Sequence, residues 1–264
     1  MSPFIHNRLF SISGFEGEYK KAEISPDALG DEIEELRSLF GFNVTVPFKE
    51  KIIPFLDRLD DSAKLYGAVN TVKNENGKLI GYNTDAYGFE RALSLAGIPF
   101  CGNVLICGCG GVARTIAISL ALKGSKITFA LRNVYSKRFI KLRDELKDRF
   151  NITVNAYNLS EISGGYDLVV NGTPVGMYPN WGCSILNSRQ LTDTGYLFDT
   201  IYNPKTTLLV STAKKLGITA VSGMGMLVMQ AVKAHEYWYN ASFNEEDIKN
   251  LICDSNVEME RIFK

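Results

Sequence analysis

Short apolar segments alternate with helical segments between residues 103 and 200, and this alternation constrains the fold more than any other feature. Residues 126–131 are typical of a buried strand, and residues 137–150 are typical of a basic amphipathic helix. The remaining predicted elements are strands at 104–107, 152–157, 167–171 and 196–200 and a helix at 112–123. Consecutive strand–helix–strand units wind right-handed into a parallel sheet with helices on both faces. We therefore expect an α/β protein.

A glycine-rich turn separates the first of these strands from its helix. Residues 108–113 read GCGGVA and fit the G-x-G-x-x-A pattern of dinucleotide-binding proteins. Gly108 permits the tight turn, Gly110 lets a pyrophosphate approach the backbone, and Ala113 allows close packing. The helix N-terminus then faces the phosphates. A plain tight turn is the alternative, but the position between a strand and a helix favours nucleotide binding.

The residues that follow the strand 126–131 distinguish NAD from NADP. An NAD enzyme has an acidic residue there, which holds the ribose 2′-hydroxyl. This chain has Arg132 and Asn133, with Lys137 one turn further on. A basic side chain can hold a 2′-phosphate through charge-assisted hydrogen bonds. A solvated arginine at a strand end is the alternative interpretation; we expect NADP.

The first third of the chain mixes short strands and helices. Ser25 and Pro26 are expected to begin a helix that ends at Gly41 and carries one apolar face, formed by Leu29, Ile33, Leu36 and Phe40. A strand at 42–46, a hairpin of 68–73 and 78–82, and a helix capped by Thr84 follow. Helices are also predicted at 223–238 and 245–263. We expect a substrate domain at 1–84, a Rossmann-like NADP-binding domain at 85–222, and C-terminal helices at 223–264 that complete the substrate domain.

Polar side chains gather at several strand ends of this first part. Asn43 and Thr45 share one face of a predicted strand, and Lys49 follows in the first turn of the next helix. A cation there opposes the positive end of the helix dipole, which suggests a functional role, although a solvent-exposed lysine is the alternative. The pairs and triplets at 70–71 and 83–85 are each typical of a turn or a cap. Together, beside a dinucleotide domain, they predict a site for a polyhydroxylated substrate.

Composition excludes several classes of protein. The chain has 29 basic and 29 acidic residues, and 45% of its residues are apolar. An apolar fraction of this size with no net charge argues against disorder, and the balanced charge disfavours nucleic acids and membrane surfaces as partners. Five cysteines do not form a disulfide scaffold in a chain of this length, and no metal is expected. His6 and His235 are expected to be structural. A cytoplasmic enzyme is the expected class.

The polar segments and the glycine loop together resemble the shikimate dehydrogenase family. The resemblance rests on segments that occur in family order over nearly the whole chain: 43–49 (NVTVPFK), 68–71 (AVNT), 83–85 (NTD), 108–111 (GCGG), 171–177 (NGTPVGM), 202–204 (YNP) and 226–231 (MLVMQA). The resemblance implies two α/β domains and reversible NADPH-dependent reduction of 3-dehydroshikimate to shikimate, a step toward chorismate and the aromatic amino acids. It implies a monomer or a homodimer without nucleic-acid or membrane partners.

The resemblance also assigns residues to roles. Lys49 and Asp85 match the catalytic pair. The substrate contacts match Ser2, Thr45, Asn70, Asp85, Tyr202 and Gln230. The cofactor side matches Gly108, Gly110, Gly111, Val112, Ala113, Arg132, Lys137, Thr173 and Met224. A ketone that receives hydride needs a proton donor or a cation at its oxygen, and Lys49 can supply both.

The chain departs from the family pattern at four places. Cys109 replaces the usual alanine, Leu131 and Asn133 replace the residues that flank Arg132 in Asn-Arg-Thr, and Ala86 replaces a glycine. The chain also starts inside the family's Ser-x-Ser-Pro motif, so the first strand and the first serine are expected in an omitted upstream segment. Two alternatives stay open: an NAD-dependent quinate/shikimate dehydrogenase, and a weakly active NADP-binding module of a larger fusion polypeptide.

Overall fold

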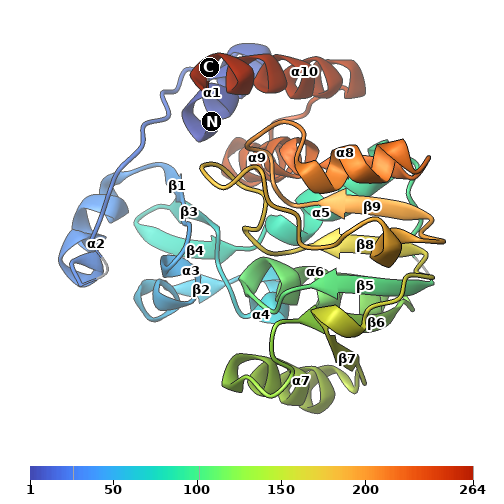
Figure 1. Cartoon of the computed structure of the whole chain (residues 1–264). Coiled ribbons are helices and arrows are strands. Elements are labelled where there is room, and N and C mark those ends of the chain that lie inside the picture. Colours follow the sequence, from blue (N-terminus) through green and yellow to red (C-terminus); the bar gives the residue numbers. More distant parts are fainter. Residues whose placement is uncertain (26, 101, 264) are drawn as a thin grey trace. The chain divides into compact units, whose positions relative to one another are not determined.

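The computed structural model describes residues 1–25, 27–100 and 102–263, and its chain divides into two compact units (Figure 1). Unit 1 consists of Met1–Gly88 and Val228–Ser255, and unit 2 of Phe89–Leu227 and Asn256–Lys264. Each unit combines helices with its own sheet. The α/β class with two domains is therefore confirmed. No helix in the described part of the chain is long and apolar enough to cross a membrane.

Unit 2 is built on a six-stranded sheet in the order β10-β9-β8-β5-β6-β7, and every neighbouring pair is parallel. Its strands are β5 (Asn103–Cys107), β6 (Lys126–Leu131), β7 (Asn155–Asn158), β8 (Leu168–Asn171), β9 (Tyr196–Asp199) and β10 (Thr219–Ser222). Its helices are α6 (Gly111–Leu122), α7 (Lys137–Phe150) and α8 (Leu208–Lys215). Short 3₁₀ turns lie at Leu159–Glu161 and Arg189–Leu191.

Helices cover both faces of this sheet, as expected. Leu197 of β9 packs in one buried cluster with Leu209 and Val210 of α8. The next residue, Phe198, points to the opposite face because side chains alternate along a strand. There it meets Phe89 of α5 (Asp85–Leu95) edge to face, with ring centroids 5.0 Å apart. The apolar residues of these short strands are therefore buried from two sides.

Unit 1 holds a four-stranded mixed sheet in the order β1-β3-β4-β2. Its strands are β1 (Gly41–Asn43), β2 (Arg58–Leu59), β3 (Thr71–Glu75) and β4 (Lys78–Tyr82). Its helices are α1 (Ser2–Ser13), α2 (Leu29–Ser38), α3 (Phe48–Lys51) and α4 (Asp61–Tyr66), with a 3₁₀ turn at Ile53–Phe55. The predicted hairpin is confirmed: β3 and β4 pair antiparallel around a two-residue turn at Asn76 and Gly77, both with positive φ.

Two C-terminal helices, α9 (Met224–Tyr239) and α10 (Glu245–Ile262), contribute residues to unit 1. The Trp238 indole N–H donates to the carbonyl of Val72 in β3 at 2.9 Å. The same ring explains Gly41, because a Cβ atom on Gly41 would lie 2.5 Å from the indole nitrogen. The functional roles of the two units remain a prediction.

Four predicted elements of the chain have bounds in the structure that differ by more than one residue; one of them is the first hairpin strand, which spans Thr71–Glu75 and not 68–73. The helix expected from Ser25 spans only Leu29–Ser38; its predicted start at Pro26 lies outside the described residues, and Phe40 is 53% exposed. It ends early because Leu39 is extended and the Phe40 carbonyl joins the sheet by accepting from Asn74 N–H. The strand expected at 42–46 stops at Asn43, because a turn closed by Thr45 and Phe48 follows.

The strand expected from residue 152 begins at Asn155. Asn151 adopts the left-handed conformation after α7, and Ile152 N–H donates back to the Leu146 carbonyl. These residues therefore close the helix and are not available to the sheet. Helices α1, α4 and α8 and strand β10 were not predicted from the sequence. By contrast, β6 and α7 have the predicted bounds.

Candidate active site

Lys49 and Asp85 form an ion pair inside unit 1. The ammonium of Lys49 lies 2.5 Å from Asp85 Oδ2, and the two side chains are 22% and 12% exposed. Lys49 belongs to the short helix α3, whose start is set by the Phe48 N–H donating to the Thr45 carbonyl. The Lys49 carbonyl in turn accepts from Val69 N–H at 2.8 Å. A cation and a carboxylate that are far apart in sequence thus meet in a partly desolvated place, where their attraction is stronger than in water.

Asn70 connects this ion pair to the rest of the cluster. Its side chain is almost completely buried, and its Nδ2 donates to Asp85 Oδ1 at 2.9 Å. The same nitrogen contacts the Thr84 hydroxyl at 3.0 Å, and Asn70 Oδ1 accepts from Thr84 N–H at 2.7 Å. Both ends of the amide are therefore engaged, which fixes its orientation. The Asp85 carboxylate in turn accepts from an amide on one side and an ammonium on the other.

Gln230 of α9 reaches the same cluster from the C-terminal part of the chain. Its Oε1 accepts from Asn70 Nδ2 at 3.3 Å and from the Thr84 hydroxyl at 3.4 Å. The structure thus brings together four residues that the sequence analysis singled out: Lys49, Asn70, Asp85 and Gln230. It adds Thr84, which the sequence presents as a helix cap. The sequence does place Thr84 between Asn83 and Asp85, within the triplet that was expected to belong to the polar site.

The other predicted substrate residues lie elsewhere. Thr45 is exposed and lies one turn before Lys49. Ser2 is the first residue of α1, and the described part of the chain contains no hydrogen bond between Ser2 and the Lys49–Asp85 cluster. Tyr202 belongs to unit 2, in the segment that follows β9, where burial raises the pKa of its hydroxyl. Ser2 and Tyr202 remain candidates on the resemblance alone.

The glycine loop of unit 2 combines one glycine that the fold requires with two glycines that have open space beside them. Gly108 has φ +92°, and a Cβ atom there would lie 2.6 Å from the Thr173 methyl group, so a larger residue does not fit. A Cβ atom on Gly110 or Gly111 would meet nothing within 4 Å. The space beside these two glycines is therefore open at the N-terminus of α6, where unpaired N–H groups bind anions.

Two further features of unit 2 fit the same ligand. Ala113 is buried, and a Cβ atom on Gly172 would lie 2.8 Å from the Ala113 methyl group, so helix α6 packs as closely as predicted. From β5 the chain adds β6 and β7 on one side of the sheet and then returns to place β8 on the other side of β5, so the strand order reverses between β5 and β8. The carboxyl ends at such a reversal of strand order are the usual place for a nucleotide. Thr173 follows β8 there, with its hydroxyl donating to Asn171 Oδ1 at 2.7 Å.

The basic residues predicted for the 2′-phosphate lie around the end of β6. Arg132 directly follows this strand, Lys137 is the first residue of α7, and both are exposed. Burial raises the pKa of the Cys109 thiol in the glycine loop, and the positive charge of Arg138 in α7 opposes that shift. Met224, at the start of α9, is 1% exposed.

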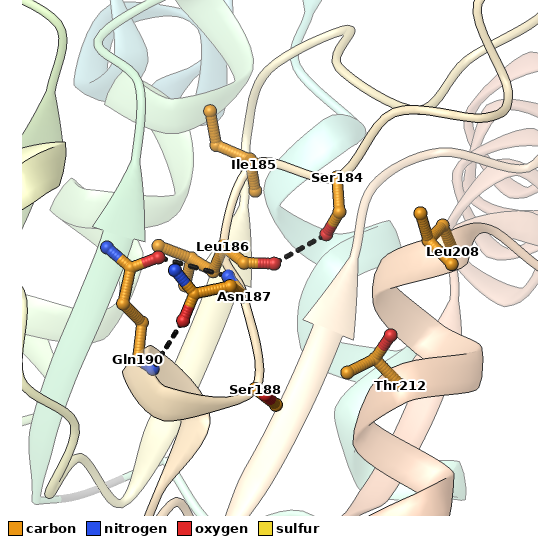
Figure 2. Close-up of a pocket in the computed structure, with 8 residues that line it drawn as sticks. All are labelled: Ser184, Ile185, Leu186, Asn187, Ser188, Gln190, Leu208 and Thr212. Atoms are coloured by element: carbon orange, nitrogen blue, oxygen red, sulfur yellow. Dashed lines mark hydrogen bonds between the residues drawn. The ribbon is translucent and has the colours of Figure 1, made fainter.

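A separate pocket of unit 2 lacks the charged side chains expected at a site for a dinucleotide or for an acidic substrate (Figure 2). It has a volume of about 440 Å³ and is lined by neutral side chains: Ser184, Ile185, Leu186, Asn187, Ser188, Gln190, Leu208 and Thr212. The side-chain oxygens of Asn187 and Gln190 each accept a hydrogen bond from the other residue's backbone N–H, and the Ser184 hydroxyl donates to the Leu186 carbonyl. Among the described residues no cation lines this pocket, so its known lining offers no positive charge for a phosphate or a carboxylate. None of the predicted site residues lines it.

Comparison with known proteins gives a consistent result over most of the chain. Residues 1–72 match the family model described as the shikimate dehydrogenase substrate binding domain. A relative from Methanocaldococcus jannaschii, named shikimate dehydrogenase (NADP(+)), is 38% identical over 96% of this chain and 92% of its own length.

Solved structures agree in fold. Shikimate 5-dehydrogenase from Thermus thermophilus, in complex with NADP(H) and shikimate, is 30% identical with a TM-score of 0.85, covering 96% of this chain and 94% of that one. A 5-ketofructose reductase of Gluconobacter is also 30% identical, with a TM-score of 0.82 and coverage of 96% and 93%. Identity and coverage together place this chain in one family: it belongs to the shikimate dehydrogenases.

Proposed function

We propose that this protein catalyses the reversible NADPH-dependent reduction of 3-dehydroshikimate to shikimate, on the route to chorismate and the aromatic amino acids. The observation that carries the proposal is the Lys49–Asp85 ion pair, held by Asn70 in a nearly buried polar cluster. Relatives with this name and with NADP support it. A cytoplasmic location remains a prediction from the sequence, and so does the oligomeric state, a monomer or a homodimer.

The reduction of a ketone to an alcohol requires one hydride and one proton. NADPH supplies the hydride when it is bound. Lys49 carries the proton that the oxygen needs, and its positive charge stabilises the negative charge that develops there. Asp85 holds the ammonium in place at Oδ2. In the reverse direction Lys49 accepts the proton of the same hydroxyl.

Recognition of the ring uses the remaining polar groups of unit 1. Asn70 Nδ2 and Gln230 Oε1 offer a donor and an acceptor beside the Asp85 carboxylate, which suits neighbouring hydroxyl groups. Ser2 and Thr45 are proposed to donate to the substrate carboxylate, and Tyr202 to lie near the substrate. A substrate with several hydroxyl groups can therefore exchange hydrogen bonds with polar atoms that already bond one another in this cluster.

The cofactor is proposed to bind in unit 2. The open space at Gly110 and Gly111 takes the pyrophosphate, and Arg132 with Lys137 holds the 2′-phosphate. Thr173 and Met224 belong to the segments at the nicotinamide end. The residue after β6 is basic, where an NAD enzyme carries an acid, so the sequence disfavours the NAD-dependent alternative.

The deciding experiment measures shikimate-dependent reduction of NADP and of NAD side by side, with quinate as the second alcohol. We expect turnover with shikimate and NADP and much weaker turnover with each other combination. Equal rates with NAD or with quinate favour the quinate/shikimate dehydrogenase. NADP binding without turnover favours the weakly active module. The reverse assay, with NADPH and 5-ketofructose, tests whether a polyhydroxylated ketone without a carboxylate is accepted.

A further inference from the structure

Tyr19 lies in the segment between α1 and α2, and contacts of three kinds fix its position. Asn7 holds its backbone: Tyr19 N–H donates to Asn7 Oδ1 at 2.8 Å, and Asn7 Nδ2 donates to the Tyr19 carbonyl at 3.2 Å. The ring stacks on His6, with centroids 4.1 Å apart and planes 6° from parallel. The hydroxyl donates to Asn43 Oδ1 at 3.1 Å. The side chain is thereby held in one orientation, directed at Asn43.

A chain of hydrogen bonds leads from this hydroxyl to Asp85. Asn43 Nδ2 donates to the Thr71 hydroxyl at 3.0 Å, and that hydroxyl donates to Asn70 Oδ1 at 3.3 Å. Asn70 Nδ2 then donates to Asp85 Oδ1 at 2.9 Å. Every group accepts from the preceding one and donates to the next. Hydrogen bonds arranged in one direction polarise and strengthen one another in a place of low dielectric.

We propose that Tyr19 is a positioning residue for the Lys49–Asp85 site and acts through Asn43, Thr71 and Asn70. This inference rests on the proposed function. Asn43 Nδ2 also donates to the Asn70 carbonyl at 3.1 Å, so Asn43 Oδ1 must face away from Asn70 and toward Tyr19. The Tyr19 hydroxyl satisfies that oxygen. The Thr71 hydroxyl and Thr84 N–H, which donates to Asn70 Oδ1 at 2.7 Å, then together hold the Asn70 amide with its nitrogen toward Asp85.

Replacement Tyr19→Phe tests this role with little change in packing. The phenylalanine ring keeps the stack on His6 but leaves Asn43 Oδ1 without its donor. The loss of one such hydrogen bond corresponds to a roughly 3- to 10-fold effect on binding. We expect the KM for shikimate to rise by about this factor and the KM for NADP to stay unchanged. A merely structural role would instead lower the folded fraction, which reduces kcat and leaves the shikimate KM as it was.

Tyr82→Phe is the matched control, because Tyr82 lies in the same unit and also stacks on an aromatic ring, that of Tyr237, at 4.1 Å. It should leave both KM values unchanged. A second pair of variants tests the middle of the chain: Thr71→Val removes the hydroxyl, whereas Thr71→Ser keeps it and should restore the shikimate KM. Effects of Tyr19→Phe and Thr71→Val should be less than additive in the double variant, since both interrupt one chain.

The outcomes separate the two proposals. A wild-type protein that does not oxidise shikimate overturns the proposed function. If the wild type oxidises shikimate but Tyr19→Phe leaves the shikimate KM unchanged, only the role of Tyr19 is overturned. The same holds if the effects of Tyr19→Phe and Thr71→Val on the shikimate KM are additive. If Tyr19→Phe does not fold, Asn7→Ala takes its place, because it releases the Tyr19 backbone and leaves every hydroxyl of the chain present. An unchanged shikimate KM in Asn7→Ala then counts against the proposal.

Discussion

At the scale of single residues, the chemistry depends on one ammonium group. Lys49 is held by Asp85 at 2.5 Å, and its side chain remains 22% exposed, so a substrate oxygen can reach it. Replacement Lys49→Ala should lower kcat by roughly 10²–10⁴-fold, the usual contribution of one general acid–base group. The KM for shikimate should change much less. Steady-state kinetics in both directions measure the two effects.

Lys51→Ala is the control for this variant, because Lys51 is exposed and belongs to the same short helix. It should retain wild-type turnover. Near-normal kcat in Lys49→Ala would remove Lys49 from the proposed mechanism.

Arg132 is the residue expected to set the choice of cofactor. It is exposed directly after β6, and a charge-assisted hydrogen bond from it to a 2′-phosphate is worth about 1.5–3 kcal/mol. Arg132→Ser should therefore weaken NADP binding by roughly 10- to 150-fold and affect NAD little. Titration of both cofactors measures this difference. Arg143→Ser, which removes an exposed arginine of α7, is the control, and equal losses for both cofactors in Arg132→Ser would contradict the assignment.

At the scale of elements, the turn between β5 and α6 separates two uses of glycine. Gly108 is required by the fold, since its φ is +92° and a Cβ atom would collide with Thr173. Gly110 has φ −77° and ψ −179°, which any residue can adopt, and has open space around it. The fold therefore does not require Gly110. We attribute its small size to the approach of the pyrophosphate.

Gly110→Ala should consequently leave the unfolding midpoint unchanged and weaken NADP binding. If the added methyl group costs about 1–3 kcal/mol against the bound pyrophosphate, the loss is roughly 5- to 150-fold. Thermal melting and cofactor titration measure the two quantities on one sample. Gly182→Ala, at another glycine with open space, should change neither. Undiminished NADP binding in Gly110→Ala would place the pyrophosphate elsewhere.

Local patterns predicted β6 and α7 of unit 2 well, but they did not predict α8 and β10 and gave other bounds for β1 and α2 of unit 1. Helix α7 and strand β6 carry their own periodicity and flanking residues, so their bounds follow from nearby sequence. Strand β1 ends where the Thr45–Phe48 turn begins, and α2 ends where Phe40 joins a strand; both depend on tertiary pairing with β3. The ends of β1 and α2 therefore could not be predicted from the residues near them in the sequence.

At the scale of the whole molecule, unit 1 is assembled from two distant parts of the chain. Gln230 reaches Asn70 across 160 positions, and Trp238 reaches the Val72 carbonyl across 166. The resemblance to a family predicted Gln230 in this site, whereas no spacing rule in the sequence relates these residues. Thr84 belongs to the triplet 83–85 that was expected in the polar site, but its contact with Gln230 could not be predicted for the same reason. The residue types therefore indicated a polar substrate site, but which side chains contact each other in it depends on the tertiary fold.

The two histidines of the chain join these same distant parts. His6 Nδ1 and His235 Nε2 lie 2.9 Å apart, both rings are completely buried, and the Tyr239 hydroxyl contacts His235 Nδ1 at 2.5 Å. Burial lowers the pKa of His235 to about 3, and burial with the neighbouring imidazole lowers the pKa of His6 well below 6.5. Protonated His6 would carry an N–H at Nε2, which has no hydrogen-bond partner among the described residues. Both imidazoles are therefore neutral in the folded state.

This pair should make folding stability depend on pH in a defined window. Below pH 6.5 the unfolded chain binds protons at both imidazoles and the folded chain does not, so the free energy of unfolding falls as pH falls. Well below pH 6.5 each imidazole contributes about 1.4 kcal/mol per pH unit, and between pH 6.5 and 5.0 it contributes about 1.6 kcal/mol, because the unfolded imidazole is only half protonated at pH 6.5. Denaturant unfolding at several pH values measures the slope above the range in which ordinary carboxyl groups titrate. His235→Gln should roughly halve it, and an identical slope in that variant would show that His235 does not titrate between the two states.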